Sequence, residues 1–328
     1  MIIQPYILGS GRAGQAMLKG LAVLELSDAE FSFKKAIKIE RAQPLKDVVK
    51  NDEFSLLLIA NPHALHAAKI LEAEGLFDLI VTEKPVCTSL EEIESLKKVK
   101  TPVAVCHGYR QSWGVQSLKK MIEAGDFGEI LSIEGRYWQS STAQRSLEKN
   151  TAQTWKNDPT LSGPHDALLD IATHWADTAI FLMPHKLKET ALWLSYVNAE
   201  AKHRDTHIHM SLSFEADKRA LCSISKMVHG AANHFEVNVV GAKKFATWKF
   251  LEPDLLEVSE GAARSFVSRK ETRWGSTQGP HHAMGWLEGY IEIFRQALRD
   301  ATGKPSEPYP NLQEALHVIE ALLTAKRT

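Results

Sequence analysis

The sequence predicts an α/β protein whose first part folds as a doubly wound parallel sheet and whose second part contains a large antiparallel sheet. Three observations support this fold class. Strand-length apolar segments alternate with helix-length segments up to about residue 110, a glycine-rich turn follows the first strand, and strand-length segments recur without helices between residues 191 and 266. Because 328 residues exceed the usual size of one hydrophobic core, we expect two domains, residues 1–112 and 113–328.

The elements of the first domain follow from short apolar runs and from helical periodicity. Strands are predicted at residues 2–8, 33–39, 54–60, 79–82 and 103–106. Helices are predicted at residues 15–24, 63–74 and 89–98, and the last begins with Ser89 and Glu92 at the spacing of a capping box. Their alternation implies that helices cover both faces of a parallel sheet.

The second domain is predicted to begin with a helix at residues 115–124 and a strand from residue 130. The polar stretch 140–164 has no regular period, and it is either a disordered insert or an active-site loop that carries Trp155. A strongly apolar helix is predicted at residues 167–182, and helices at 286–301 and 311–325 close the chain. The C-terminal helix is a candidate to pack back on the first domain.

The composition argues against several functional classes. Lys and Arg number 39 and Asp and Glu number 40, which gives a formal net charge of −1, so we expect no nucleic-acid partner. The apolar runs are too short for a membrane span or a secretory signal, so we expect a cytoplasmic protein. Three widely spaced cysteines predict neither disulfides nor a zinc site. Several histidines lack a familiar metal-ligand spacing, so we expect no metal; they are His203, His207, His209, His281 and His282.

The turn Gly9-Ser10-Gly11-Arg12-Ala13-Gly14 directly follows a predicted strand and opens a predicted helix. In this arrangement Gly9 permits the turn, Gly11 permits close approach of a phosphate, and Gly14 permits packing of the helix on the strand. An ordinary tight turn of an α/β protein is the alternative interpretation. The context favours a dinucleotide whose pyrophosphate binds at the helix N-terminus.

Glu40 stands at the end of the second predicted strand, where an acid binds the ribose hydroxyls of NAD. Its neighbour Arg41 suits the 2′-phosphate of NADP instead, because a guanidinium matches phosphate geometry. Both side chains are also typical of a solvated loop. The expected cofactor is therefore NAD or NADP, and Glu40 favours NAD.

Lys84, Asp170 and His174 are the candidate chemical groups. Asp170 and His174 are four positions apart in a predicted helix, so we expect both to project from one face. Lys84 follows the fourth strand at the edge where open α/β sheets bind ligands, and Pro85 fixes the backbone beside it. Taken separately, Asp170 and His174 also fit a hydrogen-bonded pair with a structural role, and Lys84 also fits an ordinary surface lysine. Together, an ammonium, a carboxylate and an imidazole suit the removal of a proton from an alcohol.

Several short motifs occur together along the chain. They are Gly9, Gly11 and Gly14 of the turn, Pro62 and His66, Glu83-Lys84-Pro85, Tyr109-Arg110, Gly125 with Gly128, and the run from Ala167 to His174. In these motifs, and over nearly its whole length, the chain resembles the glucose-fructose oxidoreductase, inositol dehydrogenase and rhizopine-catabolism protein family, Gfo/Idh/MocA. It departs from the usual pattern at His63, at Trp155-Lys156 and between Ser162 and Asp166.

The resemblance implies a Rossmann domain for the dinucleotide and a second domain for substrate binding and for oligomerisation, as a dimer or tetramer, through its open sheet. It also implies that Lys84 contacts the reacting hydroxyl, that His174 is the acid/base and that Asp170 positions substrate. The candidate cofactor contacts are Gly9, Gly11, Arg12, Ala13, Gly14, Glu40, Arg41, Asn61, Pro62, His63, His66, Glu83, Lys84 and Arg110. The candidate substrate contacts are Lys84, Trp155, His165, Asp170 and His174.

The leading functional hypothesis is an NAD(P)-dependent oxidoreductase that transfers a hydride between nicotinamide and a carbinol carbon of a sugar, polyol or related small polar substrate. Two alternatives remain open. One is an enzyme that uses tightly bound NAD in a redox-neutral elimination or glycoside cleavage, and the other is a cofactor-sensing regulator without turnover. The intact set of Lys84, Asp170 and His174 favours an enzyme.

Overall fold

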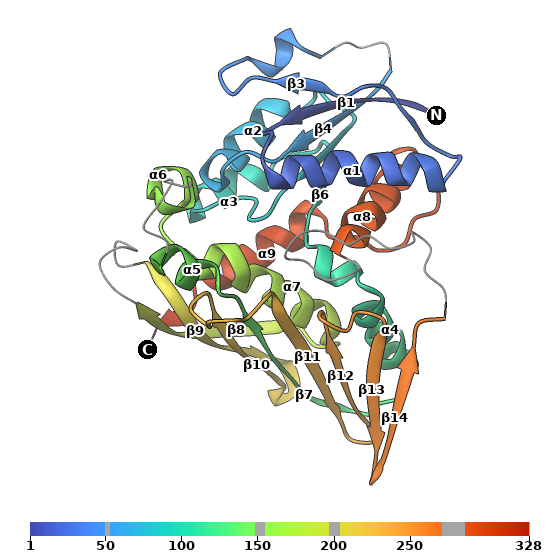
Figure 1. The fold of residues 1–328 in the computed structure, drawn as a ribbon, viewed down its shortest axis with the longest axis vertical. Coiled ribbons are helices and arrows are strands. Elements are labelled where there is room, and N and C mark those ends of the chain that lie inside the picture. The colour runs from blue at the N-terminus through green and yellow to red at the C-terminus, as the bar shows by residue number, and fades with distance from the viewer. Residues whose placement is uncertain (50–52, 148–154, 197–203, 271–285, 328) are drawn as a thin grey trace.

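Two β-sheets organise the chain, and helices fill the space between and around them (Figure 1). The computed structural model describes residues 1–49, 53–147, 155–196, 204–270 and 286–327. The first sheet is parallel and the second is large and mixed, so the predicted fold class is confirmed. Within the described residues, no helix is long and apolar enough to cross a bilayer.

The first sheet has the strand order β2-β1-β4-β5-β6, with β3 also beside β1, and every pairing in it is parallel. Its strands are β1 Ile2–Leu8, β2 Ser32–Phe33, β3 Ile37–Ile39, β4 Phe54–Ile59, β5 Leu79–Thr82 and β6 Val103–Val105. The single strand predicted at 33–39 is thus two short strands. They are separated at Lys34-Lys35-Ala36, although the amide of Lys34 still donates to the carbonyl of Ile3.

Alternation along β1 divides the first domain into two cores. Ile3 and Ile7 face α1 (Arg12–Ser27) and α8 (Trp286–Ala301), and apolar residues of both helices bury them. Tyr6 and Leu8 face the opposite side. Helices α2 (His66–Ala73), α3 (Leu90–Leu96) and α9 (Leu312–Leu323) cover that side. Both closing helices therefore pack on the first sheet, one on each face, and the first domain includes residues from the end of the chain.

The second sheet has nine strands in the order β14-β13-β12-β11-β7-β10-β9-β8-β15. The strands are β7 Ile130–Trp138, β8 Leu187–Tyr196, β9 Asp205–Phe214, β10 Arg219–Ser225, β11 His234–Gly241, β12 Phe245–Lys249, β13 Leu255–Glu260, β14 Ala263–Ser268 and β15 Lys326–Arg327. The expected antiparallel sheet is in fact mixed, because β7 pairs parallel with β10 and β8 pairs parallel with β15. β7 precedes β10 and β11 in the chain but lies between them in the sheet, parallel to β10 and antiparallel to β11.

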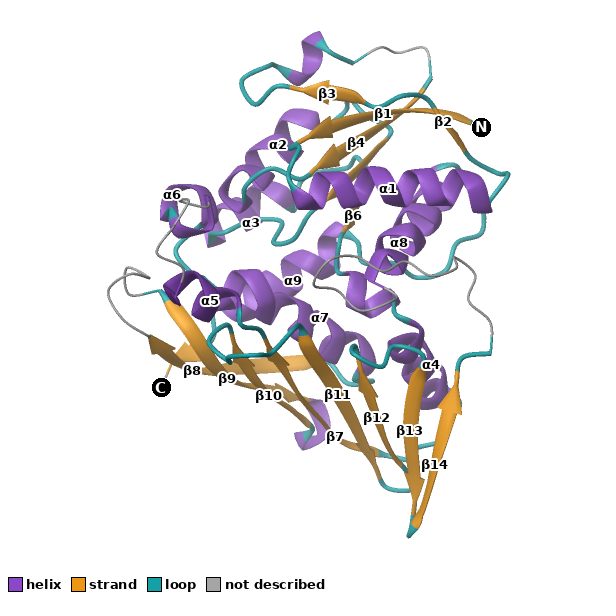
Figure 2. Ribbon diagram, viewed as in Figure 1, coloured by secondary structure: helices purple, strands orange, loops and turns teal. Residues whose placement is uncertain are grey.

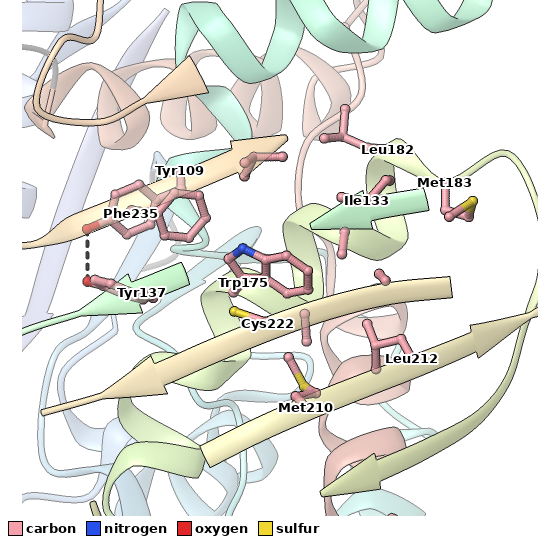
Figure 3. Packing of buried hydrophobic residues seen from close by; sticks show 14 of the residues in the cluster. Tyr109, Ile133, Tyr137, Trp175, Leu182, Met183, Met210, Leu212, Cys222 and Phe235 are labelled. Atoms are coloured by element: carbon pink, nitrogen blue, oxygen red, sulfur yellow. Dashed lines mark hydrogen bonds between the residues drawn. The ribbon is translucent and has the colours of Figure 1, made fainter. Parts of the chain in front are cut away.

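Helices cover one face of the second sheet, and Figure 2 shows its other face turned away from the rest of the chain. On the covered face, α4 (Trp113–Glu123) and α7 (Thr173–Leu182) bury a continuous apolar core. The side chain of Trp175 is fully buried in this core (Figure 3), and its Nε1 donates to the carbonyl oxygen of Glu236 at 3.2 Å. This packing fixes α7 relative to the sheet, and α7 carries His174.

The polar stretch 140–164 contains short helical elements in its described parts. These are α5 (Ser141–Leu147), a 3₁₀ turn at Trp155–Asn157, and α6 (Pro159–Ser162), which Asp158 caps through the amide of Thr160. Arg204 holds the second and third of these elements by donating to the carbonyl of Lys156 and to Oγ of Ser162. Residues 155–164 therefore form a loop that is held in place by hydrogen bonds.

Candidate functional site

A cavity of about 220 Å³ lies where the two domains meet. Arg12 and Ala13 of α1 and Lys84 after β5 line it from the first domain. Asp170 and His174 line it from the second. The structure thus brings together the three candidate chemical groups and the N-terminus of the helix that follows the glycine turn.

Lys84 reaches across the cavity to the second domain. Its Nζ donates to the carbonyl oxygen of Asp170 at 2.5 Å and to Oδ1 of the same residue at 3.0 Å. The Lys84-Pro85 peptide bond is cis. The buried ring of His66 supports this segment, because its two nitrogens lie 2.7 Å from the carbonyl oxygen of Pro85 and 2.8 Å from that of Asn61. The expected cofactor contact His66 is therefore placed as a support for the loops around the cavity.

Asp170 lies in a π-helical turn, Leu168–Ala172, that leads into α7. The predicted continuous α-helix is interrupted here by the π turn, and Asp170 and His174 nevertheless both line the cavity. A π turn is wider than an α turn and is frequent at functional sites. In this turn the carbonyl and the carboxylate of Asp170 both accept from Lys84.

Three ammonium groups surround the carboxylate of Asp170. Besides Lys84, the Nζ atoms of Lys156 and Lys226 each lie 2.8 Å from Oδ2. Burial acts to raise the pKa of Asp170, but Lys156, Lys226 and Lys84 outweigh it and hold the pKa well below its usual range. Lys226 is fully buried and also bonds Oδ1 of Asp166 at 2.5 Å. Asp170 is therefore a stable carboxylate.

His174 is a half-buried imidazole that faces the cavity. Burial, together with the positive charge of Lys84, lowers its pKa well below the usual value. Its Nδ1 is buried without a hydrogen-bond partner among the described residues, and its ring packs edge-on against His107 and Tyr109. A neutral ring beside a cavity can accept a proton from a bound hydroxyl.

The cavity wall beyond His174 contains polar residues that sequence reasoning missed. The hydroxyls of Tyr109 and Tyr137 lie 2.8 Å apart, as Figure 3 shows, and Gln139 donates to the hydroxyl of Tyr137 and to the side-chain oxygen of Asn233. All four line the cavity. Tyr109 belongs to a motif noted in the sequence, but no local pattern marks the other three. Tyr137 comes from β7, Gln139 from the segment after β7, and Asn233 from the loop before β11.

The glycine turn fits a dinucleotide pyrophosphate. A Cβ on Gly9 would lie 2.3 Å from the carbonyl oxygen of Ala60, and one on Gly14 would lie 2.1 Å from that of Gly9. A Cβ on Gly11 meets no described atom within 4 Å, so space remains for a phosphate. Among the described residues, no side chain caps the N-terminus of α1, and its first turn carries no acid. Its amides are therefore available to an anion.

Other predicted cofactor contacts surround this turn. The side-chain nitrogen and oxygen of Asn61 are buried without partners among the described residues, as expected of a group that awaits a ligand. Pro62 follows Asn61 and precedes a 3₁₀ turn. Glu83 lines the cavity and accepts from the hydroxyl of Tyr290 on α8, and burial raises the pKa of Glu83. These groups fit the nicotinamide half of a dinucleotide.

Glu40 and Arg41 follow β3, whose last residue pairs with Leu8 at the end of β1. Both side chains are exposed, and that of Glu40, 75% exposed, lies 3.3 Å from the ammonium of Lys38. This is the position from which a side chain can reach an adenosine ribose bound over β1. The structure leaves both residues free to act there.

Arg110 is placed in a buried ion-pair network, not on the cavity wall. Its guanidinium forms a bidentate pair with Asp177 of α7 and bonds Oε2 of Glu314 on α9 at 2.7 Å. Arg110 thus ties α7 and α9 to the segment after β6, and its assignment as a cofactor contact stays a prediction. Sequence reasoning missed this because its partners lie 67 and 204 positions away.

Three more predicted site residues are not among the residues that line the cavity: Trp155, His63 and His165. The ring of Trp155 packs edge-on against that of His63, with centroids 4.7 Å apart. His165 is held between Asp205, 2.7 Å from its Nδ1, and Arg327, 3.0 Å from its Nε2. These contacts anchor His165 in the loop, and its assignment as a substrate contact stays a prediction. The ammonium of Lys156 lies 5.6 Å from the centroid of the Trp155 ring.

The histidines considered for metal binding do not form a described site. His207 and His209 lie on the open face of the second sheet with their Nε2 atoms 3.2 Å apart. Where the chain is described, no group of three or more His, Cys, Asp or Glu side chains is placed to hold a metal ion. His203, His281 and His282 lie outside the described residues. All three cysteines are buried free thiols.

A sequence profile for the C-terminal alpha/beta domain of the Gfo/Idh/MocA oxidoreductase family matches residues 119–327. An uncharacterized oxidoreductase of Bacillus subtilis is 26% identical over 240 residues, which cover 69% of this chain and 61% of that relative. Levoglucosan dehydrogenase of Pseudarthrobacter phenanthrenivorans is 30% identical over 142 residues, which cover 42% of this chain and 35% of that relative. The chain thus spans less than two thirds of the length of each.

A solved structure gives a longer match. The inositol dehydrogenase homolog of Azotobacter vinelandii, complexed with NAD+, superposes on this chain with a TM-score of 0.80 and is 17% identical in sequence. The superposition covers 99% of this chain and 94% of the homolog's chain. At this identity the likeness shows the fold. It extends over both domains.

Proposed function

The chain belongs to the Gfo/Idh/MocA oxidoreductase family. We propose that it transfers a hydride between a nicotinamide dinucleotide and a carbinol carbon of a sugar, polyol or related small polar substrate. One observation carries this proposal. Lys84, Asp170 and His174 converge on a cavity that also receives the N-terminus of α1. The names of the relatives, levoglucosan dehydrogenase among them, agree with a hydroxylated substrate.

Each group of the chain has a distinct task in this reaction. The neutral imidazole of His174 accepts the proton of the substrate hydroxyl during oxidation and returns it during reduction. The ammonium of Lys84 stabilises negative charge as it develops on the same oxygen. The carboxylate of Asp170 orients Lys84 and offers an acceptor to a neighbouring substrate hydroxyl. When bound, the nicotinamide ring supplies the redox chemistry.

The residues around the glycine turn would hold that cofactor. The amides that begin α1 would bind the pyrophosphate, and Asn61 and Glu83 would contact the nicotinamide half. We propose that NAD is preferred, because the carboxylate of Glu40 stands where ribose hydroxyls are bound. NADP remains the competing cofactor, since Arg41 is adjacent and exposed.

The test is a panel of sugars, inositols and sugar acids with NAD and with NADP, followed by the absorbance of reduced nicotinamide. Substrate-dependent formation of reduced cofactor supports the proposal. Substrate conversion without net reduced cofactor would instead identify a redox-neutral reaction. Saturable dinucleotide binding without conversion of any substrate would identify the cofactor-sensing alternative.

We also propose that the open face of the second sheet binds a second copy of this chain. Trp193 and Leu221 are large apolar residues on this face, and each is 45% exposed. Trp193 stands directly beside His209 in the sheet register, so the apolar and imidazole side chains form one surface. An isologous pairing of such faces would bury these residues in a dimer.

A further inference from the structure

His174 can act as a base in only one of its two neutral forms. Its Nδ1 is buried, so Nε2 is the ring nitrogen left to meet a substrate hydroxyl in the cavity. A neutral imidazole carries one proton, and the nitrogen that accepts must be the one without it. The reactive form of His174 therefore holds its proton on Nδ1. This N–H is a buried donor, and Nδ1 has no hydrogen-bond partner within the described residues.

The groups around His174 offer few acceptors for this proton. In Ser-His-Asp sites a carboxylate accepts from Nδ1–H and fixes the ring. Asp170 stands four positions before His174, but lysine ammonium groups hold its carboxylate oxygens. The rings of Tyr109 and Tyr137 pack against His174, and their hydroxyls lie 2.8 Å from each other. Among the described rings in contact with His174, this leaves that of His107.

His107 brings a second buried ring nitrogen to this contact. It follows β6 and is 1% exposed, and its ring stands at 88° to that of His174 with centroids 5.5 Å apart. Its Nδ1, like that of His174, is buried without a partner among the described residues. The amide of His107 donates to the carbonyl of Val105 at 2.7 Å, and its carbonyl accepts from the amide of Arg110 at 3.1 Å. The backbone therefore holds the ring in place.

Both rings are neutral near neutral pH. Burial lowers the pKa of His107 to about 4, and burial together with Lys84 lowers the pKa of His174 well below its usual value. One neutral ring can thus donate while the other accepts. The charged groups that act on the two rings are Lys84, Arg110, Lys156, Asp170 and Asp177.

We propose that His107 is the positioning residue of His174, and that one water joins the Nδ1 atoms of the two rings. The water accepts from Nδ1–H of His174 and donates to the lone pair on Nδ1 of His107, which satisfies both buried nitrogens. The inference rests on the proposed function and deepens it. When the substrate hydroxyl gives its proton to Nε2, His174 becomes positively charged, and the bond at Nδ1 becomes charge-assisted and stronger. No proton passes to His107.

The tautomer of His174 tests this contact without a substrate. Nitrogen NMR of protein with isotope-labelled histidine rings reports which nitrogen carries the proton, and loss of signals in His174→Gln assigns them. Wild-type His174 is expected in the Nδ1–H form. His107→Phe keeps an aromatic ring but offers no acceptor, so the proton should move largely to Nε2, which faces the cavity. His107→Asn carries an amide oxygen and should retain the Nδ1–H form.

Kinetics link the contact to catalysis. With a substrate found in the sugar panel, His107→Phe should lower kcat by about 10- to 100-fold. KM and NADH affinity should stay near their wild-type values, because the tautomer affects the chemical step and not binding. His107→Asn should recover most of the lost kcat. The matched control is His317→Phe, at an exposed histidine of α9, which should behave as wild type in both measurements.

Three outcomes would overturn the inference: an Nε2–H form of His174 in the wild-type protein, the same tautomer in wild type and His107→Phe, or an unchanged kcat in His107→Phe. The first outcome needs no variant, so it decides the question even if His107→Phe does not fold. If the wild-type protein converts no substrate with either cofactor, the proposed function fails, whereas the tautomer still decides the contact between the rings.

Discussion

The ammonium of Lys84 lies 3.0 Å from Oδ1 of Asp170, although 86 positions separate the two residues. Lys84 ends a strand of the first sheet, and Asp170 lies in the π turn that leads into α7 on the second sheet. The contact therefore joins the two domains at the cavity. Because Lys156 and Lys226 also bind Asp170, this carboxylate stays paired when Lys84 is removed.

Replacing Lys84 with Met should reduce turnover by about 100- to 10,000-fold, because the group that stabilises charge on the reacting oxygen is lost. Dinucleotide affinity should change little, since the glycine turn and α1 are untouched. Steady-state assays measure the first quantity and NADH fluorescence titration the second. The exposed Lys98→Met is the matched control. Turnover near the wild-type rate in Lys84→Met would remove the proposed mechanism.

Acidification should destabilise the protein between about pH 6.5 and pH 4. Burial lowers the pKa of four histidines, His63, His66, His107 and His174, and that of His107 falls to about 4. Below pH 6.5 the unfolded chain binds protons at these rings and the native state does not. The free energy of unfolding therefore decreases as the pH is lowered. Each ring contributes up to about 1.4 kcal/mol per pH unit.

Urea unfolding at several pH values measures this dependence. His107→Asn should flatten the slope, because one proton-binding difference between the two states is removed. The exposed His317→Asn should leave the slope unchanged. A free energy of unfolding that is constant or rises on acidification would show that the buried rings are protonated in the native state.

The parallel sheet and the glycine turn could be predicted from sequence because their signals are local. Each strand of the first sheet is a short apolar run, and the steric need for Gly9 and Gly14 arises within one strand-turn-helix unit. Lys84 was predictable for the same reason, since the end of a parallel strand is a fixed place relative to the ligand edge.

The remaining features depend on contacts between distant parts of the chain. The π turn at Asp170 follows the same apolar pattern as an α-helix, so periodicity does not reveal it. Lys226 directly follows β10, and its partners Asp166 and Asp170 lie 60 and 56 positions away in the chain. Arg110 stood beside a motif tyrosine, but its role depends on where α7 and α9 cross the segment after β6.

Arg110→Met should destabilise the fold by about 3–5 kcal/mol, because it leaves the buried carboxylate of Asp177 unpaired. Combining it with Asp177→Leu should recover much of that loss, since both charges are then absent. Urea denaturation gives the free energies, and NADH titration of the folded protein gives affinity. Weaker NADH binding at unchanged stability would instead support Arg110 as a cofactor contact.

Glu40→Ala should shift cofactor preference toward NADP. Loss of the carboxylate removes an acceptor for the ribose hydroxyls and a repulsion toward a 2′-phosphate, so the ratio of kcat/KM for NADP to that for NAD should rise about tenfold. Lys38 and Arg41 then remain as nearby cations. Glu91→Ala, in the first turn of α3, is the control. An unchanged ratio would place the adenosine ribose away from Glu40.

Charge on the open sheet should prevent self-association. Trp193→Glu combined with Leu221→Glu places two carboxylates on the face proposed to pair with a second copy, and burying unpaired charges there is strongly unfavourable. Light scattering after size-exclusion chromatography should give at least a dimer for wild type and a monomer for the double variant. Leu71→Glu, at an exposed leucine of α2, should keep the wild-type mass. A monomeric wild type, or a double variant of unchanged mass and circular dichroism, would exclude this face as the interface.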